Sequence, residues 1–557
     1  MSLRLLLPVS MPLVAVLATG CVPTSPAPAR VAQAPARPAP TPECPDGEPC
    51  PEPGAQAPDS STGIGDDETL ALPGADPIGP DAVLNPGPLD DPAGDARDAS
   101  DGPAGPDGND ARAAGDASAT PVAGADKTAA LVPGDAGDGS KPQIIIREIP
   151  RQPAAATFEV TSDSALIWAY SPEPGKGRID LDMAETSKSG RLRFKRVSSQ
   201  VVTMRERTGR TGVVELGRLR SDQRYRYRLQ LGNGQATSWY SFRTAPAGRS
   251  DAQVHFLVGA DISNDPRFES TIFERMAGSR ADFLVSLGDW PYTDIPLRNT
   301  RIAEYRAAHR AARLSGAVTP LLQSMPIYAI YDDHEIRDNW DQAFQTEDPE
   351  RFRAGLEVWD EFFPLRSKVK VRDSLDRRRY RTIQRGRHLE IFMLDTRRYR
   401  SPYRDPDGPQ KTMLGAEQRA WLERELQRSR ASFKVIVTSV PLGFGTTGDH
   451  WSAYAQERDA LLAFIRDRKI RGVVFVTADQ HWFASHLHAG GIHELQVGPL
   501  ASFLRSPPEE DPPPEVLARH VLRNYGEIIV TGGTRPRLVF MARDENGGLI
   551  HTELIAR

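Results

Sequence analysis

Apolar residues divide the chain into four stretches of different character. A short apolar run, Leu5–Leu17, precedes a long stretch in which apolar residues show no helical or strand period. From residue 154 to 246, short runs alternate apolar and polar positions between Gly, Pro and Asp, a pattern typical of an all-β sandwich. From residue 252 to 557, buried-strand patterns alternate with helical ones, which predicts an α/β layered core.

The runs of the first folded region are predicted strands. They are Thr157–Val160, Ala165–Tyr170, Arg178–Met183, Gly212–Leu216, Arg224–Leu231 and Ser238–Arg243. Trp168 in the second run and Tyr225 in the fifth resemble the core tryptophan and the tyrosine corner of fibronectin type III-like domains. Neither residue supplies catalytic chemistry, and a generic sandwich would look much the same.

The second folded region carries the stronger periodicities. Apolar spacing predicts helices at Gly415–Arg430 and Ala455–Asp467, followed by strands at Lys434–Ser439 and Gly472–Val476. The alternation from Glu527 to Ile555 predicts an antiparallel hairpin that turns at residues 545–548. The basic helical stretch Arg301–Arg313 is interpreted as a solvated face, with a lid as the alternative, and His486 and His488 as exposed strand residues.

Four acidic motifs follow predicted strands in this region. They are Gly259-Ala260-Asp261, Gly288-Asp289-Trp290-Pro291-Tyr292, Asp332-Asp333-His334-Glu335 and Ala478-Asp479-Gln480-His481. Carboxylates just past the carboxyl ends of parallel strands converge on one crevice. They repel one another unless something positive lies between them. Each motif alone has an ordinary explanation, such as a turn or a helix cap, but four in order indicate a site for one or two metal ions.

The residue types predict different ions at two positions. Asp289 is placed to bridge both ions, and Asp261, Tyr292 and His481 complete a mixed oxygen and nitrogen set for the first. A phenol ligates well only when a strong Lewis acid lowers its pKa from about 10, which favours Fe³⁺. Asp333 and Asp479 offer only oxygen to the second ion, which favours a hard cation such as Ca²⁺. His334 is free to transfer protons, and Asn339 could contact phosphate or metal.

These motifs resemble the alkaline phosphatase D (PhoD-like) family of the metallophosphoesterase superfamily over roughly residues 154–557. The motifs that carry the resemblance are Gly-Asp-x-x-Tyr at 288–292, Asp-Asp-His-Glu at 332–335, Leu-Asp-Thr-Arg at 394–397, Leu414-Gly415 with Gln418, and Asp-x-His at 479–481. The resemblance implies that a hydroxide bridging two ions attacks phosphorus, that His334 is the general acid, and that Arg397 lies near the phosphate. The chain departs from the expected pattern in two respects. The catalytic region has no cysteine to ligate iron in the first motif, and the stretch Thr438–Leu442 lacks the histidine that the similar purple acid phosphatases have after the later core strand.

Composition separates the predicted domains. Residues 22–141 contain no Phe, Trp or Tyr and hold 21 acidic but only 6 basic side chains. Such a segment buries too little apolar surface to offset chain entropy, so residues 22–150 are predicted to be a disordered linker. The β-sandwich domain is predicted at 154–246 and the metallophosphatase domain at 252–557. The remainder of the chain is mildly basic, which suits an anionic substrate, and no specific nucleic-acid binding is expected.

Residues 1–20 are predicted to be an export signal. Arg4 precedes the apolar run, and Ala18, Thr19 and Gly20 precede Cys21. Leu-Ala-Thr-Gly-Cys resembles the bacterial lipobox, which implies lipidation of Cys21 and an outer-membrane lipoprotein facing the periplasm or cell surface. Ordinary cleavage, which would leave a periplasmic protein, is the alternative. Cys44 and Cys50 are the only other cysteines, and their role stays open.

The sequence therefore predicts an exported, metal-dependent phosphoric-ester hydrolase. Monoester and diester substrates use the same machinery, so the preference between them stays open. One alternative is a phospholipase D-like phosphodiesterase. The other is a non-catalytic surface lipoprotein whose metal site is a remnant, which is disfavoured because every expected metal position has a plausible ligand.

Overall fold

The computed structural model describes residues 127–132, 143–148, 152–295, 298–366, 374–443, 449–508 and 514–556. The predicted leader, Cys21, Cys44 and Cys50 lie outside the described residues, as does most of the predicted linker. Within the described ranges, no helix combines the length and the apolar character required to span a bilayer.

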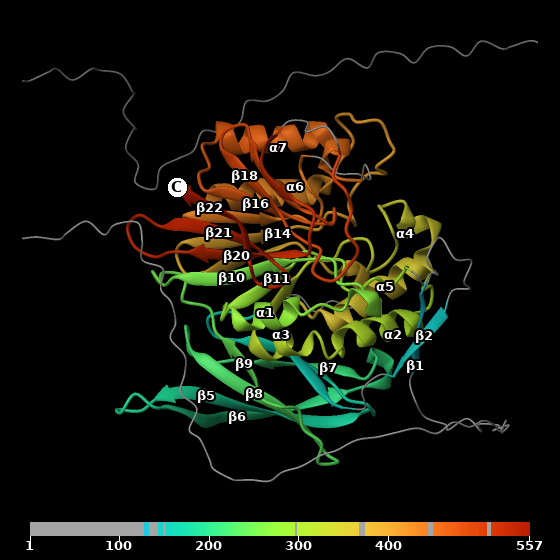
Figure 1. Ribbon diagram of the computed structural model, residues 1–557, viewed down its shortest axis with the longest axis vertical. Coiled ribbons are helices and arrows are strands. Elements are labelled where there is room, and N and C mark those ends of the chain that lie inside the picture. Colours follow the sequence, from blue (N-terminus) through green and yellow to red (C-terminus); the bar gives the residue numbers. More distant parts are fainter. Residues whose placement is uncertain are drawn as a thin grey trace, which may run out of the picture. The chain divides into compact units, whose positions relative to one another are not determined.

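Two β-sheets packed face to face form the centre of the α/β region (Figure 1). In the described part of the chain, one sheet has the order β22 (Leu549–Ala556), β21 (Arg537–Asp544), β20 (Asn524–Val530), β10 (Val254–Gly259), β11 (Phe283–Ser286), β12 (Ile327–Ala329), β3 (Ala154–Phe158), β4 (Ala165–Tyr170), β7 (Thr211–Leu216). The other has the order β13 (Arg381–Arg385), β14 (Leu389–Met393), β15 (Phe433–Val437), β16 (Val473–Thr477), β18 (Ile492–Gln496), β17 (Phe483–His488), β19 (Glu515–His520). Phe256, Val435 and Phe540 are among the buried side chains between them.

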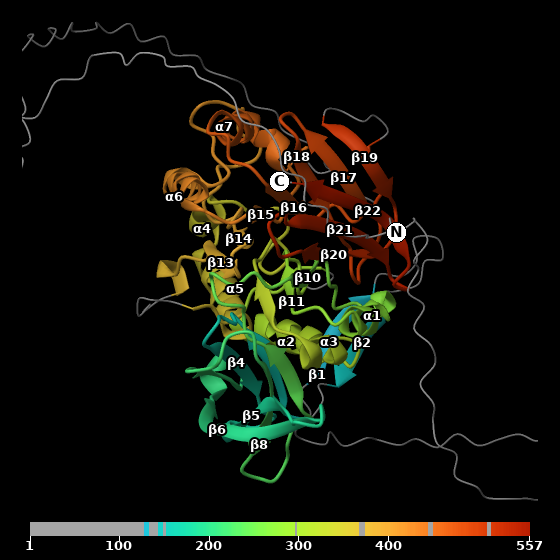
Figure 2. The same ribbon diagram turned by 90° about the vertical axis from the view of Figure 1, so that its left-hand side faces the viewer.

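Helices cover the outer faces of both sheets (Figure 2). On one side lie α6 (Gly415–Arg428) and α7 (Ala455–Asp467), whose Leu422 and Ile465 pack with Phe475 of β16. On the other side lie α1 (Ile272–Gly278), α2 (Ile302–Arg313), α3 (Thr319–Ser324), α4 (Phe344–Glu347) and α5 (Pro349–Phe362). This four-layer arrangement confirms the predicted α/β sandwich, and the predicted helices and strands of this region are present within a few residues of their expected ends.

The N-terminal strands form the predicted all-β sandwich. One of its sheets is the β3-β4-β7 end of the nine-stranded sheet, and the other has the order β6 (Leu192–Met204), β5 (Gly175–Thr186), β8 (Arg224–Leu231), β9 (Tyr240–Arg243). Trp168 is fully buried in the core, and the hydroxyl of Tyr225 accepts a hydrogen bond from the backbone N of Arg220 at 2.8 Å, as a tyrosine corner requires.

The sandwich and the α/β core share structure. β3 pairs in parallel with β12 through Phe158 and Ile327, and Phe158, Trp168 and Phe363 belong to one continuous buried cluster. The nine-stranded sheet thus passes from one region into the other. The domain boundary expected between residues 246 and 252 stays a prediction.

Three features of the local structure were not predicted from the sequence. The predicted linker contains an antiparallel pair, β1 (Lys127–Val132) and β2 (Gln143–Glu148), because these two runs are richer in apolar residues than the segment average. The long strand β6 has no match among the predicted runs. The stretch from Arg301 to Arg313 is a helix as expected but not a wholly solvated one: His309 and Arg313 are buried, and the Arg313 guanidinium lies over the rings of Phe363 and Trp290 at 4.5 and 4.8 Å.

Candidate metal centre

Four strands deliver acidic side chains to one place. Asp261 follows β10, Asp289 follows β11 and Asp333 follows β12, and these three strands are parallel neighbours in one sheet. Asp479 and His481 follow β16 of the facing sheet. All of these side chains are buried. The carboxyl ends of parallel strands from both sheets thus meet at the predicted crevice.

The backbone at these positions is held in an unfavourable conformation. The φ angles are +62° at Asp261, +54° at Asp289, +75° at Asp479 and +64° at His481, all in the left-handed region that residues with a Cβ seldom adopt. Gly288, at φ +109°, has no room for a Cβ, which would lie 2.6 Å from the backbone N of Asp332. Such strain persists where the surrounding fold imposes it and is concentrated at functional sites.

The ligand atoms form three overlapping groups, each with all members within 4.8 Å of one another. They are Asp261-Asp289-His481, Asp289-Asp333-His334 and Asp289-Asp332-Asp333-Asp479. Asp289 belongs to all three, as a carboxylate bridging two ions would. The first and third groups match the two predicted ion positions, except that Asp332 joins the third.

Electrostatics favour cations at this centre. Burial raises the pKa of Asp261, Asp289 and Asp479 well above the usual range, and neighbouring carboxylates raise it further. Both carboxylate oxygens of Asp261, Oδ2 of Asp289 and Oδ2 of Asp332 have no hydrogen-bond partner. Buried acidic oxygens without partners are costly unless a cation is coordinated. The donor set of oxygens and one imidazole therefore fits metal ions.

Tyr292 lies beside the first group. Its hydroxyl is 2.8 Å from Nε2 of His481, and its ring stacks on His334 with centroids 4.2 Å apart. Burial raises the pKa of Tyr292 well above 10, and the charges of Asp289 and Asp261 raise it further. Burial also lowers the pKa of His481, which keeps its imidazole neutral and able to ligate. Tyr292 would thus ionise only against a strongly polarising ion.

His334 is oriented by an aspartate that the sequence analysis missed. Its Nδ1 lies 2.8 Å from Oδ1 of Asp294, whose other oxygen accepts the backbone N–H of Asp338 at 2.5 Å. Burial disfavours the charged imidazole, but the carboxylates of Asp333, Asp289 and Asp294 raise the pKa of His334 well above its usual value. The spacing of residues along the sequence does not indicate Asp294, because only the folded loop after Tyr292 brings it next to His334.

Arg397 contacts the acidic centre from the protein interior. Its side chain is fully buried, its Nε binds Asp332, its Nη1 lies 2.7 Å from Asp449, and its Nη2 lies 3.3 Å from Asp333. Ser439 also donates to Asp332, at 2.5 Å. This environment does not support the predicted contact between Arg397 and phosphate, since the guanidinium has no exposed surface and faces three carboxylates. It positions Asp332 and Asp333 instead.

The remaining predicted residues have varied surroundings. Asn339 has φ +53° and its backbone N–H binds Oδ2 of Asp333 at 2.7 Å, while a contact of its side chain with phosphate or metal stays a prediction. The expectation that His486 and His488 are exposed was wrong. Both side chains are buried beside Glu494, whose Oε2 is 2.7 Å from Nε2 of His488. The face of β17 that carries them is covered by other parts of the protein, so it is not exposed to solvent.

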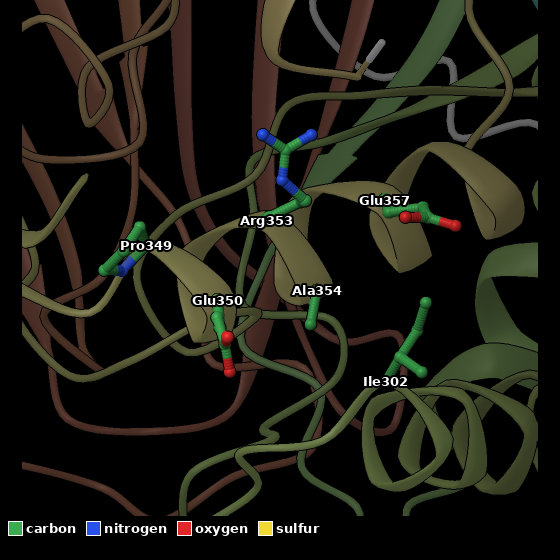
Figure 3. A pocket seen from close by; sticks show the side chains of 6 residues that line it. All are labelled: Ile302, Pro349, Glu350, Arg353, Ala354 and Glu357. Carbon is green, nitrogen blue, oxygen red and sulfur yellow. The ribbon is translucent and has the colours of Figure 1, made fainter. Parts of the chain in front are cut away.

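A separate surface pocket lies between the start of α2 and the first turns of α5 (Figure 3). It has a volume of about 240 Å³ and is lined by Ile302, Pro349, Glu350, Arg353, Ala354 and Glu357. None of these residues is a candidate ligand. This pocket is therefore distinct from the acidic centre.

Known proteins share the sequence and fold of this region. Residues 259–527 match the family model of the PhoD-like phosphatases. The alkaline phosphatase D of Bacillus subtilis (strain 168) is 25% identical over 381 residues, which is 60% of this chain and 65%, less than two thirds, of that protein.

Two solved structures have a similar fold. The structure of PhoD aligns with a TM-score of 0.62 at 21% identity, covering 72% of this chain and 88% of that one. A purple acid phosphatase isolated from yellow lupin (Lupinus luteus) seeds aligns with a TM-score of 0.53 at 14% identity, covering 76% and 78%.

Proposed function

We propose that the protein is a metal-dependent phosphoric-ester hydrolase, a proposal supported by the match of residues 259–527 to the family model of the PhoD-like phosphatases. One observation carries the proposal: buried carboxylates with unpartnered oxygens converge on Asp289, which is common to all three groups of ligand atoms. A remnant site would be expected to have lost some of these ligands, whereas every expected metal position has a plausible ligand in this sequence.

The ligand groups could hold two metal ions, and Asp289 belongs to the groups of both. Asp261, His481 and Tyr292 would hold the first, and Asp333 and Asp479, with Asp332, the second. When bound, such ions supply Lewis-acid activation of water and neutralise charge on a phosphoryl group.

The residues around the ions have distinct roles in this proposal. His334 protonates the leaving alkoxide, and Asp294 holds the imidazole in place through Nδ1. Arg397 fixes the directions of Asp332 and Asp333 without reaching solvent. The backbone N–H of Asn339 holds the second oxygen of Asp333, so that one carboxylate is restrained from two sides.

We infer that the first ion is Fe³⁺ and the second Ca²⁺. The phenol of Tyr292 favours a strongly polarising ion, and the all-oxygen surroundings of the second position favour a hard cation. Tyrosinate bound to Fe³⁺ absorbs visible light, so the purified protein should be coloured and Tyr292→Phe should remove the colour. Chelation should abolish activity and Ca²⁺ should restore it. A colourless, iron-free but active protein would overturn the iron assignment, and restoration by Zn²⁺ alone would overturn the calcium assignment.

Substrate assays test the proposed function directly. Purified full-length protein should hydrolyse members of a panel of phosphomonoesters, phosphodiesters and phospholipids, with metal content measured on the same preparation. Hydrolysis of diesters and phospholipids alone would favour the phospholipase D-like alternative. A metal-loaded protein that hydrolyses no member of the panel would contradict the proposal.

The location of the enzyme is a separate proposal. We propose that the protein is exported and anchored to the outer membrane through lipidated Cys21, which rests on the leader Leu5–Leu17 and the Leu-Ala-Thr-Gly-Cys sequence. Cys21→Ser should release the protein from the membrane fraction. An unchanged membrane fraction, or wild-type protein without lipid, would contradict the anchor.

A further inference from the structure

A segment after β18 is fastened to the backbone of the first metal position. The N–H of Leu500 donates to Ala260 at 2.9 Å, and the N–H of Ala501 donates to the carbonyl of Asp261 at 3.0 Å. The N–H of Ser263 donates back to Ala501 at 2.8 Å. These three hydrogen bonds fix the direction in which the chain leaves residue 501, so the side chains that follow have a defined position relative to Asp261.

The next residues place a ring and a guanidinium beside His481. The half-buried ring of Phe503 meets the His481 imidazole edge-on, with centroids 4.3 Å apart. The guanidinium of Arg505 lies over the Phe503 ring at 5.2 Å, and the backbone N of Arg505 is 3.4 Å from the carbonyl of His481. Arg505 is half-buried, so part of its side chain is open to solvent.

Arg505 differs from the other arginines around the centre in having no carboxylate partner of its own among the described residues. Arg397 is fully buried against three carboxylates. Arg267 is held by two hydrogen bonds to Asp265, and the ring of its neighbour Phe268 lies 6.3 Å from that of Phe503. The acidic groups whose charges act on the Arg505 guanidinium are those of the candidate metal centre, among them Asp479 and Asp333.

Metal ions at the centre would change the charge that the Arg505 guanidinium faces. Once metal ions offset the charges of Asp289, Asp333 and Asp479, these carboxylates attract the Arg505 guanidinium less, and an anion bound at the ions would take their place. A phosphoryl group held at the ions is such an anion, and guanidinium matches its oxygens in geometry and charge.

We propose that Arg505 donates to a non-bridging oxygen of the substrate phosphoryl group, and that Phe503 forms the adjoining wall of the substrate site. This inference rests on the proposed hydrolase function. The cationic side chain that binds the substrate is then the half-exposed Arg505 after β18 rather than the buried Arg397. Because a monoester dianion carries more charge than a diester monoanion, Arg505 favours phosphomonoesters.

Two variants and one control test the role. Arg505→Ala should lower kcat/KM for a phosphomonoester by about 10- to 100-fold, the loss expected for one charged hydrogen bond. The loss for a diester should be smaller, and inorganic phosphate should inhibit the variant more weakly. Arg505→Lys keeps the charge and should recover part of the loss. Arg267→Ala removes an arginine that is already held by Asp265, and it should hydrolyse both substrates at the wild-type rate.

The outcomes separate this inference from the proposed function. If wild-type protein hydrolyses no phosphate ester, the proposed function fails. If wild-type protein is active and Arg505→Ala matches it in kcat, KM and phosphate inhibition, only the role of Arg505 is overturned. A loss of activity accompanied by loss of metal in Arg505→Ala would assign the residue to support of His481 and would also overturn substrate binding.

Discussion

The role proposed for His334 rests on the surroundings of its side chain. It stacks on Tyr292, belongs to a ligand group with Asp289 and Asp333, and is hydrogen-bonded through Nδ1 to Asp294. A histidine held in this way keeps its other nitrogen for a proton transfer. Sequence spacing predicted the histidine, whereas the aspartate that orients it became visible only in the folded chain.

Replacement of His334 tests the proton transfer. His334→Ala should lower kcat for alkyl phosphates by roughly 10² to 10⁴, the usual contribution of a general acid, while metal content stays near the wild-type value. The loss should be smaller with nitrophenyl phosphate, whose leaving group needs little protonation. Asp294→Asn, which keeps the imidazole, should lose less. An equal loss of rate for good and poor leaving groups would argue against the role.

Glu494 gives a prediction for stability as a function of pH. Burial raises its pKa, but the hydrogen bond with His488 and the charges of His486 and His488 outweigh burial and lower the pKa to about 2. Since the ordinary value is 4.5, the carboxylate stabilises the folded state fully above about pH 4.5 and loses this effect as pH falls toward 2.

The variant Glu494→Gln tests this dependence of stability on pH. It should unfold more easily than the wild type by about 3 kcal/mol at pH 6, and the difference should shrink steadily below pH 4.5. Denaturant unfolding at several pH values measures this. A difference that stays constant between pH 6 and pH 3 would show that the charge of Glu494 does not contribute.

At the scale of elements, strands with strong apolar patterns could be predicted and polar ones could not. β10, β11 and β16 are buried on both faces and read as continuous apolar runs, so their ends located the acidic motifs. β6 lies at the edge of its sheet, is mostly exposed and carries charged residues, so its sequence lacks that signal. The role of Arg505 depends on a loop path that no local pattern specifies.

The tyrosine corner offers a test at this scale. Tyr225→Phe removes the hydroxyl that accepts from the N–H of Arg220 and should lower the free energy of unfolding by about 1 kcal/mol. Activity per folded molecule should not change, because Tyr225 lies in the β-sandwich rather than at the metal centre. A loss of activity at full stability would instead connect this corner to the catalytic region.

At the scale of the whole described region, the centre depends on two sheets meeting at their carboxyl ends. Asp261, Asp289 and Asp333 come from one sheet and Asp479 and His481 from the other. The acidic motifs of the sequence predicted these five residues, because each motif directly follows its strand along the chain. They did not predict that β3 and β12 would join the sandwich to the catalytic sheet, since pairing between distant strands leaves no local signature.

Asp289 is the residue on which the account depends most, because every group of ligand atoms includes it. The decisive measurement is the metal content and phosphomonoester hydrolysis of wild-type protein and Asp289→Asn, made on the same preparations, with folding checked by circular dichroism. Wild-type protein should contain two metal ions and hydrolyse the ester, and the variant should stay folded while losing metal and activity together. A folded variant that keeps both its metal and its rate would contradict a metal-dependent hydrolase centred on Asp289.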